Sequence, residues 1–324
     1  MVLHDIKHKI SPLMQNYIAA RKKITDSEIP LICQIHDHIQ NHKGKQLRPL
    51  LTILSACCCG LPLNAAPSHP VFLAAAAIET LHTSTLVHDD VIDESDLRRG
   101  AKTVNSLWNN KTAVLMGDFY LAKVMKTIND IDNKHLTEII NNAVIEMSEG
   151  ELLQQQYSGH YDIDENTYLQ IISKKTAILI AVCCETGAIL ANAENSLRQT
   201  FRAFGNELGI AFQMRDDIID YLSSQKTGKP TGNDIRERKC TLPLILALKN
   251  NVIHNKILPL LIKESFSDND INSVIDTVTK DGYLEIARTK MLNRLDNASQ
   301  ILSSIPDTPY RQNLNEIICL LKEI

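Results

Sequence analysis

Two groups of aspartates in the sequence have the residue types and the spacing to bind a divalent cation. Each group ends an apolar segment with the pattern Asp-Asp-x-x-Asp, and the members are Asp89, Asp90 and Asp93 in the first, and Asp216, Asp217 and Asp220 in the second. On a helix, the first and last aspartates of such a group share one face, one turn apart. Like charges at this spacing destabilise a bare helix, so the pattern favours a bound cation. Mg²⁺ prefers hard oxygen ligands of this kind and shares them with substrate phosphates, which predicts a diphosphate ligand.

One such group alone is also typical of a solvated helix end. The second copy favours the metal interpretation, because two triads on two helices could face each other across a helical bundle. Several cations follow the triads and could meet a diphosphate: Arg98 and Arg99 after the first, and Lys226, Lys229, Arg236, Arg238 and Lys239 after the second. Guanidinium groups bind phosphate oxygens as a two-pronged fork, and lysine supplies a movable charge. Singly, such residues are also common at helix C-termini, where they interact with the helix dipole.

Helices are the elements that must position these residues. Apolar residues recur every three or four positions along most of the chain, as in Leu284, Met291 and Leu295. Breaks are expected at 61–70, 130–134, 158–164, 223–238 and 303–309, where Gly, Pro and polar residues gather. No linker separates two cores, so the sequence predicts an all-α fold with residues 1–324 as a single domain.

Composition excludes several classes of protein. The chain has 324 residues, of which 44% are hydrophobic and 22% charged, with a net charge of −4. This excludes a disordered chain and argues against a nucleic-acid partner. The longest apolar runs, 71–78 and 177–184, are far shorter than the roughly 18 residues of a membrane span. The N-terminus lacks the apolar stretch of a secretory signal. We therefore expect a cytoplasmic protein without a transmembrane segment.

Seven motifs in order along the chain carry a resemblance to a known family. They are Gly44-Lys45-Gln46-Leu47-Arg48-Pro49, Glu79-Thr80-Leu81-His82-Thr83, Asp96-Leu97-Arg98-Arg99-Gly100, Gly117-Asp118, Lys175-Thr176-Ala177, the second triad, and the stretch from Gly228-Lys229 to Lys239-Cys240-Thr241-Leu242-Pro243. Over nearly its whole length the chain resembles the trans-polyprenyl diphosphate synthases, most closely the bacterial octaprenyl diphosphate synthases. The resemblance implies a large helical bundle of the isoprenoid synthase type with a central elongated cavity, Mg²⁺ as cofactor, and a homodimer.

The resemblance also implies roles for individual residues. The Mg²⁺ ligands are Asp89, Asp93 and Asp216, and Asp90, Asp217 and Asp220 complete the catalytic triads. A clamp for isopentenyl diphosphate is formed by Lys45, Arg48, His82 and Arg99. The allylic diphosphate is surrounded by Arg98, Lys175, Thr176, Gln213, Lys229 and Lys239, with Lys175 also counted as catalytic. His82 and the pair Lys175-Thr176 could also have purely structural roles. His82 could be a core histidine, and Lys175-Thr176 could be a charged turn on a helix over 168–190.

The implied reaction joins an allylic diphosphate, farnesyl diphosphate, to successive isopentenyl diphosphates. The allylic C–O bond ionises first, the alkene of isopentenyl diphosphate then attacks the cation, and a proton is lost. The implied product is octaprenyl (C40) diphosphate for quinone side chains, with transient membrane contact when it is released. Alternatives are a shorter product, from geranylgeranyl to heptaprenyl, and a non-catalytic regulatory subunit of such an enzyme. A class I terpene cyclase is disfavoured, because such enzymes generally lack a full second Asp triad.

Product length is expected to depend on the helix before Asp89. Thr85, Leu81 and Ile78 lie four, eight and eleven positions earlier and share one helical face. Because Ser84 and Thr85 are small, this face is expected to line an open tunnel, although small residues also serve close helix packing. The chain departs from the family where Lys43 and Arg238 each replace a common Gly. Each side chain either obstructs a close backbone approach or adds a cation near the diphosphate.

Overall fold

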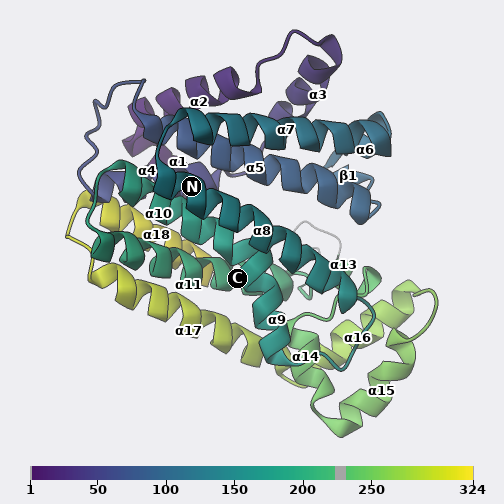
Figure 1. Cartoon of the computed structure of the whole chain (residues 1–324). Helices are drawn as coiled ribbons and strands as arrows, with labels where there is room; N and C mark the ends of the chain where they lie inside the picture. The colour runs from purple at the N-terminus through teal and green to yellow at the C-terminus, as the bar shows by residue number, and fades with distance from the viewer. Residues whose placement is uncertain (1, 223–230, 324) are drawn as a thin grey trace. The chain divides into compact units, whose positions relative to one another are not determined.

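The computed structural model describes residues 2–222 and 231–323, which form helices almost throughout (Figure 1). The elements up to the second triad are α1 (Val2–Lys9), α2 (Ser11–Thr25), α3 (Pro30–Asn41), α4 (Leu47–Cys58), α5 (Pro70–Ile92), β1 (Leu97–Arg98), β2 (Ala101–Lys102), α6 (Val104–Leu107), α7 (Asn110–Asp130), α8 (Lys134–Gln156), α9 (Glu165–Ile172), η1 (Ser173–Ala177), α10 (Ile178–Leu190) and α11 (Asn195–Ile219). The later elements are α13 (Asn233–Arg236), α14 (Leu242–Leu248), α15 (Asn251–Leu261), α16 (Asp268–Lys280), α17 (Tyr283–Ser303) and α18 (Pro309–Lys322). The predicted all-α class is confirmed.

The predicted breaks at 61–70, 130–134, 158–164 and 303–309 separate helices as expected. Of the predicted break at 223–238, residues 223–230 lie outside the described residues, and the described part differs from the prediction because it contains the short helix α13. The described chain divides into two compact units. The first unit contains the residues up to Asn141 together with Val182–Phe201 and Ile305–Ile317, and the second contains Asn142–Ala181, Arg202–Ser304 and the residues from Ile318 onward. That residues 1–324 form a single domain stays a prediction.

Helix α5 is the centre of the first unit and packs against α2, α4 and α7. Its segment Ala74–Ala77 is completely buried, because alanine side chains let neighbouring helices approach closely. A helix that is apolar on all sides is stable only when it is buried. This packing holds the first aspartate triad at the C-terminal end of α5.

Two helices are long and apolar enough to cross a membrane by length and composition. They are α5 and the continuous helix Glu165–Leu190, and 72% and 61% of their apolar windows are buried inside the fold. Burial of this extent is typical of the core helices of soluble proteins.

Strands β1 and β2 are the two that the described residues contain, and they form an antiparallel hairpin with Leu97 opposite Lys102. Arg99 and Gly100 make its two-residue turn with φ angles of 54° and 77°. A turn with both central residues at positive φ matches the twist of a short hairpin. The hairpin therefore fixes Arg98 and Arg99 just beyond the first triad.

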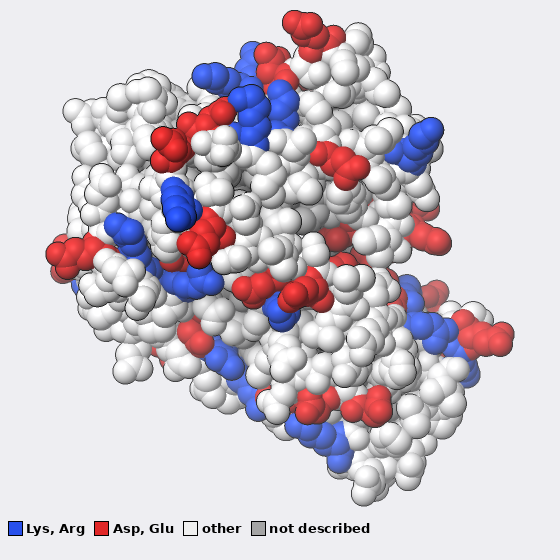
Figure 2. All heavy atoms as spheres, in the orientation of Figure 1, with Lys and Arg blue, Asp and Glu red and all other residues white. Residues whose placement is uncertain are grey.

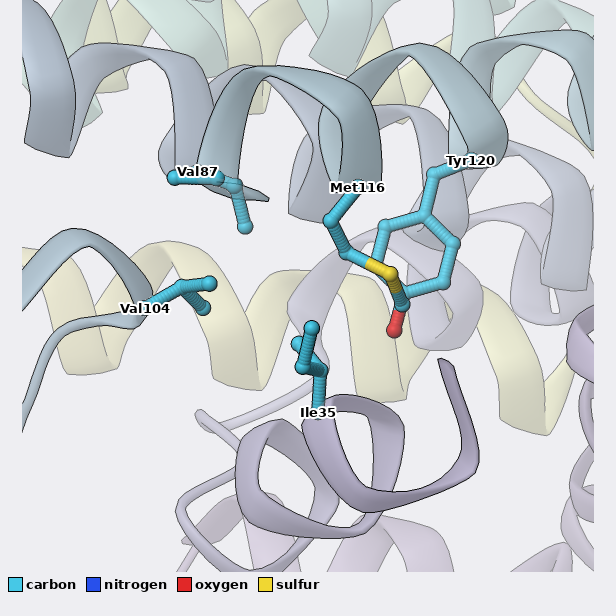
Figure 3. Packing of buried hydrophobic residues seen from close by; sticks show 6 residues of the cluster. Ile35, Val87, Val104, Met116 and Tyr120 are labelled. Carbon is cyan, nitrogen blue, oxygen red and sulfur yellow. The ribbon is translucent and has the colours of Figure 1, made fainter. Parts of the chain in front are cut away.

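A hydrophobic cluster joins helices α3, α5, α6 and α7 on either side of the hairpin in the sequence (Figure 3). It joins Ile35 of α3, Val87 of α5, Val104 of α6, and Met116 and Tyr120 of α7, all at most 4% exposed. Removing side chains of this size from a closed core destabilises a protein by about 2–5 kcal/mol. The cluster thus fixes the C-terminal part of α5 relative to α3, α6 and α7.

The second unit is organised around α14, whose seven residues are all buried. It packs against α9, α15, α16 and α17. Charged side chains of both signs are interspersed over the face shown in Figure 2, without a broad patch of one sign.

Candidate active site

The first triad lies at the C-terminal end of α5, with Asp93 as the C-cap residue. Asp90 is buried, and the Arg98 Nε donates a hydrogen bond to its Oδ1 at 2.6 Å. Burial raises the pKa of Asp90, while Arg98 acts in the opposite direction. Asp89 and Asp93 are half-buried on one helical face. Asp90 is therefore engaged within the protein, and the other two carboxylates have the one-turn spacing predicted for metal ligands.

Beside this triad lies a cavity of about 60 Å³, here named the arginine cavity. It is lined mainly by charged and aromatic residues of the first unit, which include Arg21, His38, His42, Lys43, Glu79, His82, Asp90, Arg98, Arg99 and Lys102. Of the predicted clamp, His82 and Arg99 line it. The exposed Lys45 and the half-buried Arg48 do not.

The Arg99 guanidinium packs directly on the backbone of Gly44. A Cβ at position 44 would lie 2.6 Å from the Arg99 Cζ, so the Arg99 guanidinium would have to move away. This contact gives the first motif, Gly44-Lys45, a structural reason for its glycine: it leaves room for a cation of another motif.

Positive charge dominates the electrostatics of the arginine cavity. Burial lowers the pKa of His82 well below its usual range, and Arg48, Arg99, Arg98 and Arg21 lower it further. The imidazole is therefore neutral at pH 7. Although Arg48 does not line the cavity, its charge acts on His82.

Glu79 is the second buried titratable group of this cavity, with 5% exposure. Burial raises its pKa, and the nearby cations Arg21, Arg48, Arg99 and Lys7 oppose that change. The single carboxyl group of Glu79 therefore faces four positively charged side chains and cannot neutralise them all. The excess positive charge suits the arginine cavity to an anion.

The second triad lies at the end of α11 and is tied to its surroundings through two of its members. The Tyr168 hydroxyl donates to Asp217 Oδ2 at 2.6 Å, and Gln213 Nε2 donates to Oδ1 at 2.8 Å. Burial raises the pKa of Asp217 to about 7.

Asp220 holds the start of α13, because its carboxylate accepts the backbone N–H groups of Asn233 at 3.1 Å and Asp234 at 3.0 Å. Burial raises the pKa of Asp220, and these N–H groups oppose the rise. Asp216 is half-buried. That Asp216 is a metal ligand stays a prediction.

A second cavity, of about 130 Å³, lies beside this triad and is here named the lysine cavity. Five of the predicted site residues line it: Lys175, Thr176, Gln213, Asp217 and Lys239. Thr176 Oγ1 donates to Gln213 Oε1 at 2.8 Å, which orients the Gln213 amide toward Asp217. The structure therefore brings together residues that lie more than sixty positions apart in the sequence, as the resemblance implied.

A turn of π-helix, η1, presents Lys175 and Thr176 to the lysine cavity. The helix expected over 168–190 is continuous from Glu165 to Leu190 but widens at Ser173–Ala177. Single π-turns inside α-helices occur frequently at functional sites. Gly150 of α8 packs against this turn, where an added Cβ would lie 2.7 Å from the Lys175 backbone N.

Both lysines of the lysine cavity have carboxylate partners. Lys175 forms an ion pair with Glu151, and Lys239 Nζ lies 2.5 Å from Glu237 Oε2. Lys229, which was also predicted to contact the allylic diphosphate, lies outside the described residues.

The two departures from the family pattern have different structural outcomes. Lys43 is exposed at the rim of the arginine cavity and adds a cation there. Arg238 has a φ of 57°, in the region that favours glycine, but does not line the lysine cavity. Its Nη2 donates to the carbonyl groups of Lys263 and Glu264, both at 2.7 Å, and its guanidinium lies over the Phe266 ring.

The residues predicted to set product length line neither cavity. Ile78 and Leu81 are buried in the core, and the Ser84 hydroxyl donates to the Gly117 carbonyl of α7 at 2.7 Å. Ser84 thus serves close helix packing, the alternative that the sequence left open. Thr85 is half-buried on the same face of α5 as Asp89. That these residues control chain length stays a prediction.

Several site residues were not predicted from the sequence. Arg21 and Glu79 line the arginine cavity, Tyr168 lines the lysine cavity, and Glu151 pairs with Lys175. Arg21 and Glu79 carried a usable signal, because each is a charged residue among the apolar positions of a helical repeat. The roles of Tyr168 and Glu151 arise only from packing.

Metal binding was tested against the donor groups present. Within residues 2–222 and 231–323, no group of three or more His, Cys, Asp or Glu side chains is arranged to hold a metal ion. Mg²⁺ typically takes one or two carboxylates, several waters and substrate phosphates rather than an all-protein cage. The pair Asp89 and Asp93 supplies the carboxylates that such a site needs.

Comparison with known proteins decides the family, because the sequence model described as polyprenyl synthetase matches residues 29–278. The chain belongs to the polyprenyl synthetase family. It is 38% identical to the all-trans-nonaprenyl-diphosphate synthase (geranyl-diphosphate specific) of Rhodobacter capsulatus, over 96% of this chain and 95% of the relative. It is 33% identical to the octaprenyl diphosphate synthase of Escherichia coli, over 97% and 96%.

A solved structure supports the same assignment for the fold. The polyprenyl synthase from Caulobacter crescentus, complexed with calcium and isoprenyl diphosphate, has a TM-score of 0.92 and 30% identity, covering 99% of this chain and 98% of that one. Membership of the polyprenyl synthetase family confirms the predicted isoprenoid synthase fold. It also confirms the predicted enzyme class, and the chain is a prenyltransferase that makes prenyl diphosphates.

Proposed function

We propose that this prenyltransferase condenses farnesyl diphosphate with successive isopentenyl diphosphates to all-trans octaprenyl (C40) diphosphate for quinone side chains. The observation that carries the proposal is the lysine cavity, where Lys175, Thr176, Gln213 and Lys239 converge beside the second triad. Two ammonium groups and two polar side chains suit the oxygens of an allylic diphosphate. The arginine cavity then takes isopentenyl diphosphate.

Catalysis in this proposal rests on charge stabilisation at the leaving group. The allylic C–O bond breaks with its electron pair going to the diphosphate, whose growing charge is met by Lys175 and Lys239. The double bond of isopentenyl diphosphate then forms the new C–C bond to the allylic cation, and a proton is lost to the released diphosphate. Arg48, His82 and Arg99, with Lys45, hold the second substrate so that its alkene is positioned for attack.

Mg²⁺ completes the site in this proposal, with Asp89, Asp93 and Asp216 as its protein ligands. When bound, it supplies Lewis-acid stabilisation of the leaving diphosphate. The half-buried positions of these three aspartates support this assignment, as does the relative whose structure was solved with calcium and isoprenyl diphosphate. That the two triads face each other stays a prediction.

The test is incubation of the purified protein with farnesyl diphosphate, labelled isopentenyl diphosphate and Mg²⁺, followed by sizing of the products by thin-layer chromatography. The expected result is a ladder that ends at C40, is lost in EDTA and returns when Mg²⁺ is added back. A protein that incorporates no label under these conditions would instead be the regulatory subunit considered above.

A C45 product is the second candidate, because the relative with 38% identity is named a nonaprenyl diphosphate synthase. The same ladder separates the two, and replacing farnesyl by geranyl diphosphate as primer tests the specificity named for that relative. A shorter product, from geranylgeranyl to heptaprenyl, would end the ladder earlier. That the protein is a cytoplasmic homodimer that contacts the membrane transiently, without a nucleic-acid partner, stays a prediction.

A further inference from the structure

Arg21 is a charged residue in the interior of the first unit. It belongs to none of the seven motifs that the chain shares with the family. It lies on the buried face of α2 with Tyr17 and Ile24, while the neighbouring Lys22 and Lys23 are exposed. Its side chain is among the lining groups of the arginine cavity, and only 7% of the residue is exposed. A guanidinium keeps its charge at any physiological pH, so Arg21 carries a permanent positive charge into this core.

Two of the three guanidinium nitrogens of Arg21 have no hydrogen-bond acceptor, although the Tyr17 hydroxyl is near enough for Arg21 to oppose the rise of its pKa that burial causes. Nη2 donates to Thr83 Oγ1 at 3.3 Å, whereas Nε and Nη1 are buried without a hydrogen-bond partner. Leaving donors of a charged group unsatisfied in a protein interior is unfavourable. An acceptor that enters the arginine cavity would relieve that cost.

The neighbouring carboxylates do not supply this acceptor. Across the described part of the chain, no ion pair within 4.0 Å joins Arg21 to Glu79, although the charges of the two residues influence each other. Glu79 also faces Arg48, Arg99 and Lys7. Asp90, the other carboxylate of the cavity, is engaged by Arg98 at 2.6 Å.

We propose that Arg21 binds the diphosphate of isopentenyl diphosphate in the arginine cavity, together with Arg99. This inference rests on the proposed function, since it assigns a further ligand to the same substrate. The unpartnered Nε and Nη1 of Arg21 point in different directions, so each can donate a charge-assisted hydrogen bond to a different oxygen of a diphosphate. Arg21 therefore increases the affinity of the protein for isopentenyl diphosphate. It does not contact the allylic diphosphate, so it leaves the affinity for that substrate unchanged.

The experiment compares the KM values of the two substrates in Arg21→Met, Arg21→Lys and the wild type, with Mg²⁺ present. Loss of charge-assisted hydrogen bonds is expected to raise the KM for isopentenyl diphosphate about 10- to 100-fold in Arg21→Met. The KM for farnesyl diphosphate stays unchanged, and Arg21→Lys is intermediate. The control is Arg198→Met, because Arg198 is a half-buried arginine of the first unit that donates to the Ala193 carbonyl and lines neither cavity.

Titration calorimetry with isopentenyl diphosphate in EDTA gives a second readout that does not depend on turnover. The Kd is expected to rise by the same factor in Arg21→Met. Unchanged values of both KM and Kd for isopentenyl diphosphate overturn the inference, and so do equal rises of KM for both substrates, which indicate a structural role. If Arg21→Met does not fold, the same comparisons on Arg21→Lys decide the question. A wild-type protein that makes no prenyl product refutes the proposed function, and calorimetry still decides the role of Arg21.

Discussion

At the level of single residues, the six aspartates divide by their surroundings. Three of them accept hydrogen bonds from protein groups. Asp90 accepts from a guanidinium, Asp217 from a phenol and an amide, and Asp220 from two backbone N–H groups. The other three, Asp89, Asp93 and Asp216, are half-buried. The hydrogen bonds of Asp90, Asp217 and Asp220 stabilise the ends of the two helices, and the metal-binding role of Asp89, Asp93 and Asp216 stays a prediction.

Removing one of the second set is expected to abolish most activity without unfolding the protein. Asp89→Asn and Asp216→Asn should each lower kcat by about 100-fold or more, because each removes charge that stabilises the bound metal and the leaving group. The unfolding free energy should change by less than about 1 kcal/mol, since relief of like-charge repulsion is a small effect. Asp130→Asn, at an exposed position of α7, is the control. Wild-type rates in both triad variants would refute the metal assignment.

His82 gives a pH dependence whose sign follows from its surroundings. Because burial and four arginines lower its pKa below the unfolded value near 6.5, its contribution to stability is present above pH 6.5 and is lost as the pH falls below it. His82→Gln should therefore lose less stability than the wild type between pH 7.5 and 5.5, by at most about 1.4 kcal/mol per pH unit. Urea unfolding at the two pH values measures this. Parallel losses in both proteins would show that His82 is not the group responsible.

At the level of elements, the π-turn η1 depends on the absence of a side chain at Gly150. In Gly150→Ala the new methyl group would lie 2.7 Å from the Lys175 backbone N and 2.8 Å from the Lys174 Cβ. We expect a loss of about 1–3 kcal/mol in stability, typical of overpacking. The displaced Lys175 should also raise the KM for farnesyl diphosphate. Asn142→Ala on the exposed side of α8 is the control, and an unaltered KM in Gly150→Ala would separate the turn from substrate binding.

Helix α5 carries the prediction about product length. Thr85 lies one turn before Asp89 on a half-buried face, so an aromatic ring there is expected to block the growing chain. Thr85→Phe should shorten the longest product on a chromatographic ladder. Ala122→Phe, at an exposed position of α7, should leave the ladder unchanged. A wild-type ladder from Thr85→Phe would show that this face of α5 does not limit elongation.

At the level of the whole molecule, the resemblance predicts a homodimer. Helix α7 exposes the adjacent apolar side chains Val114 and Leu115, at 40% and 58%. If these side chains are buried between two copies, the wild type should have twice the mass of one chain in light scattering, and Leu115→Asp should weaken that assembly. Ile262→Asp, at a position of the second unit that is 65% exposed, is the control. A monomeric wild type would contradict the prediction.

The sequence by itself determined the helical class, four of the breaks between helices, the aspartate pairs and the family. These features depend on short spacings, since Asp89 and Asp93 share a face simply because a helix turns every 3.6 residues. The resemblance already grouped Lys175, Gln213 and Lys239, and only the tertiary structure decided which other residues line the two cavities. Lys175, Gln213 and Lys239 meet, Lys45 and Arg48 remain outside the arginine cavity, and Arg21 enters it. Contacts between distant positions depend on how helices pack and on which charged groups that packing removes from water, and no local spacing encodes them.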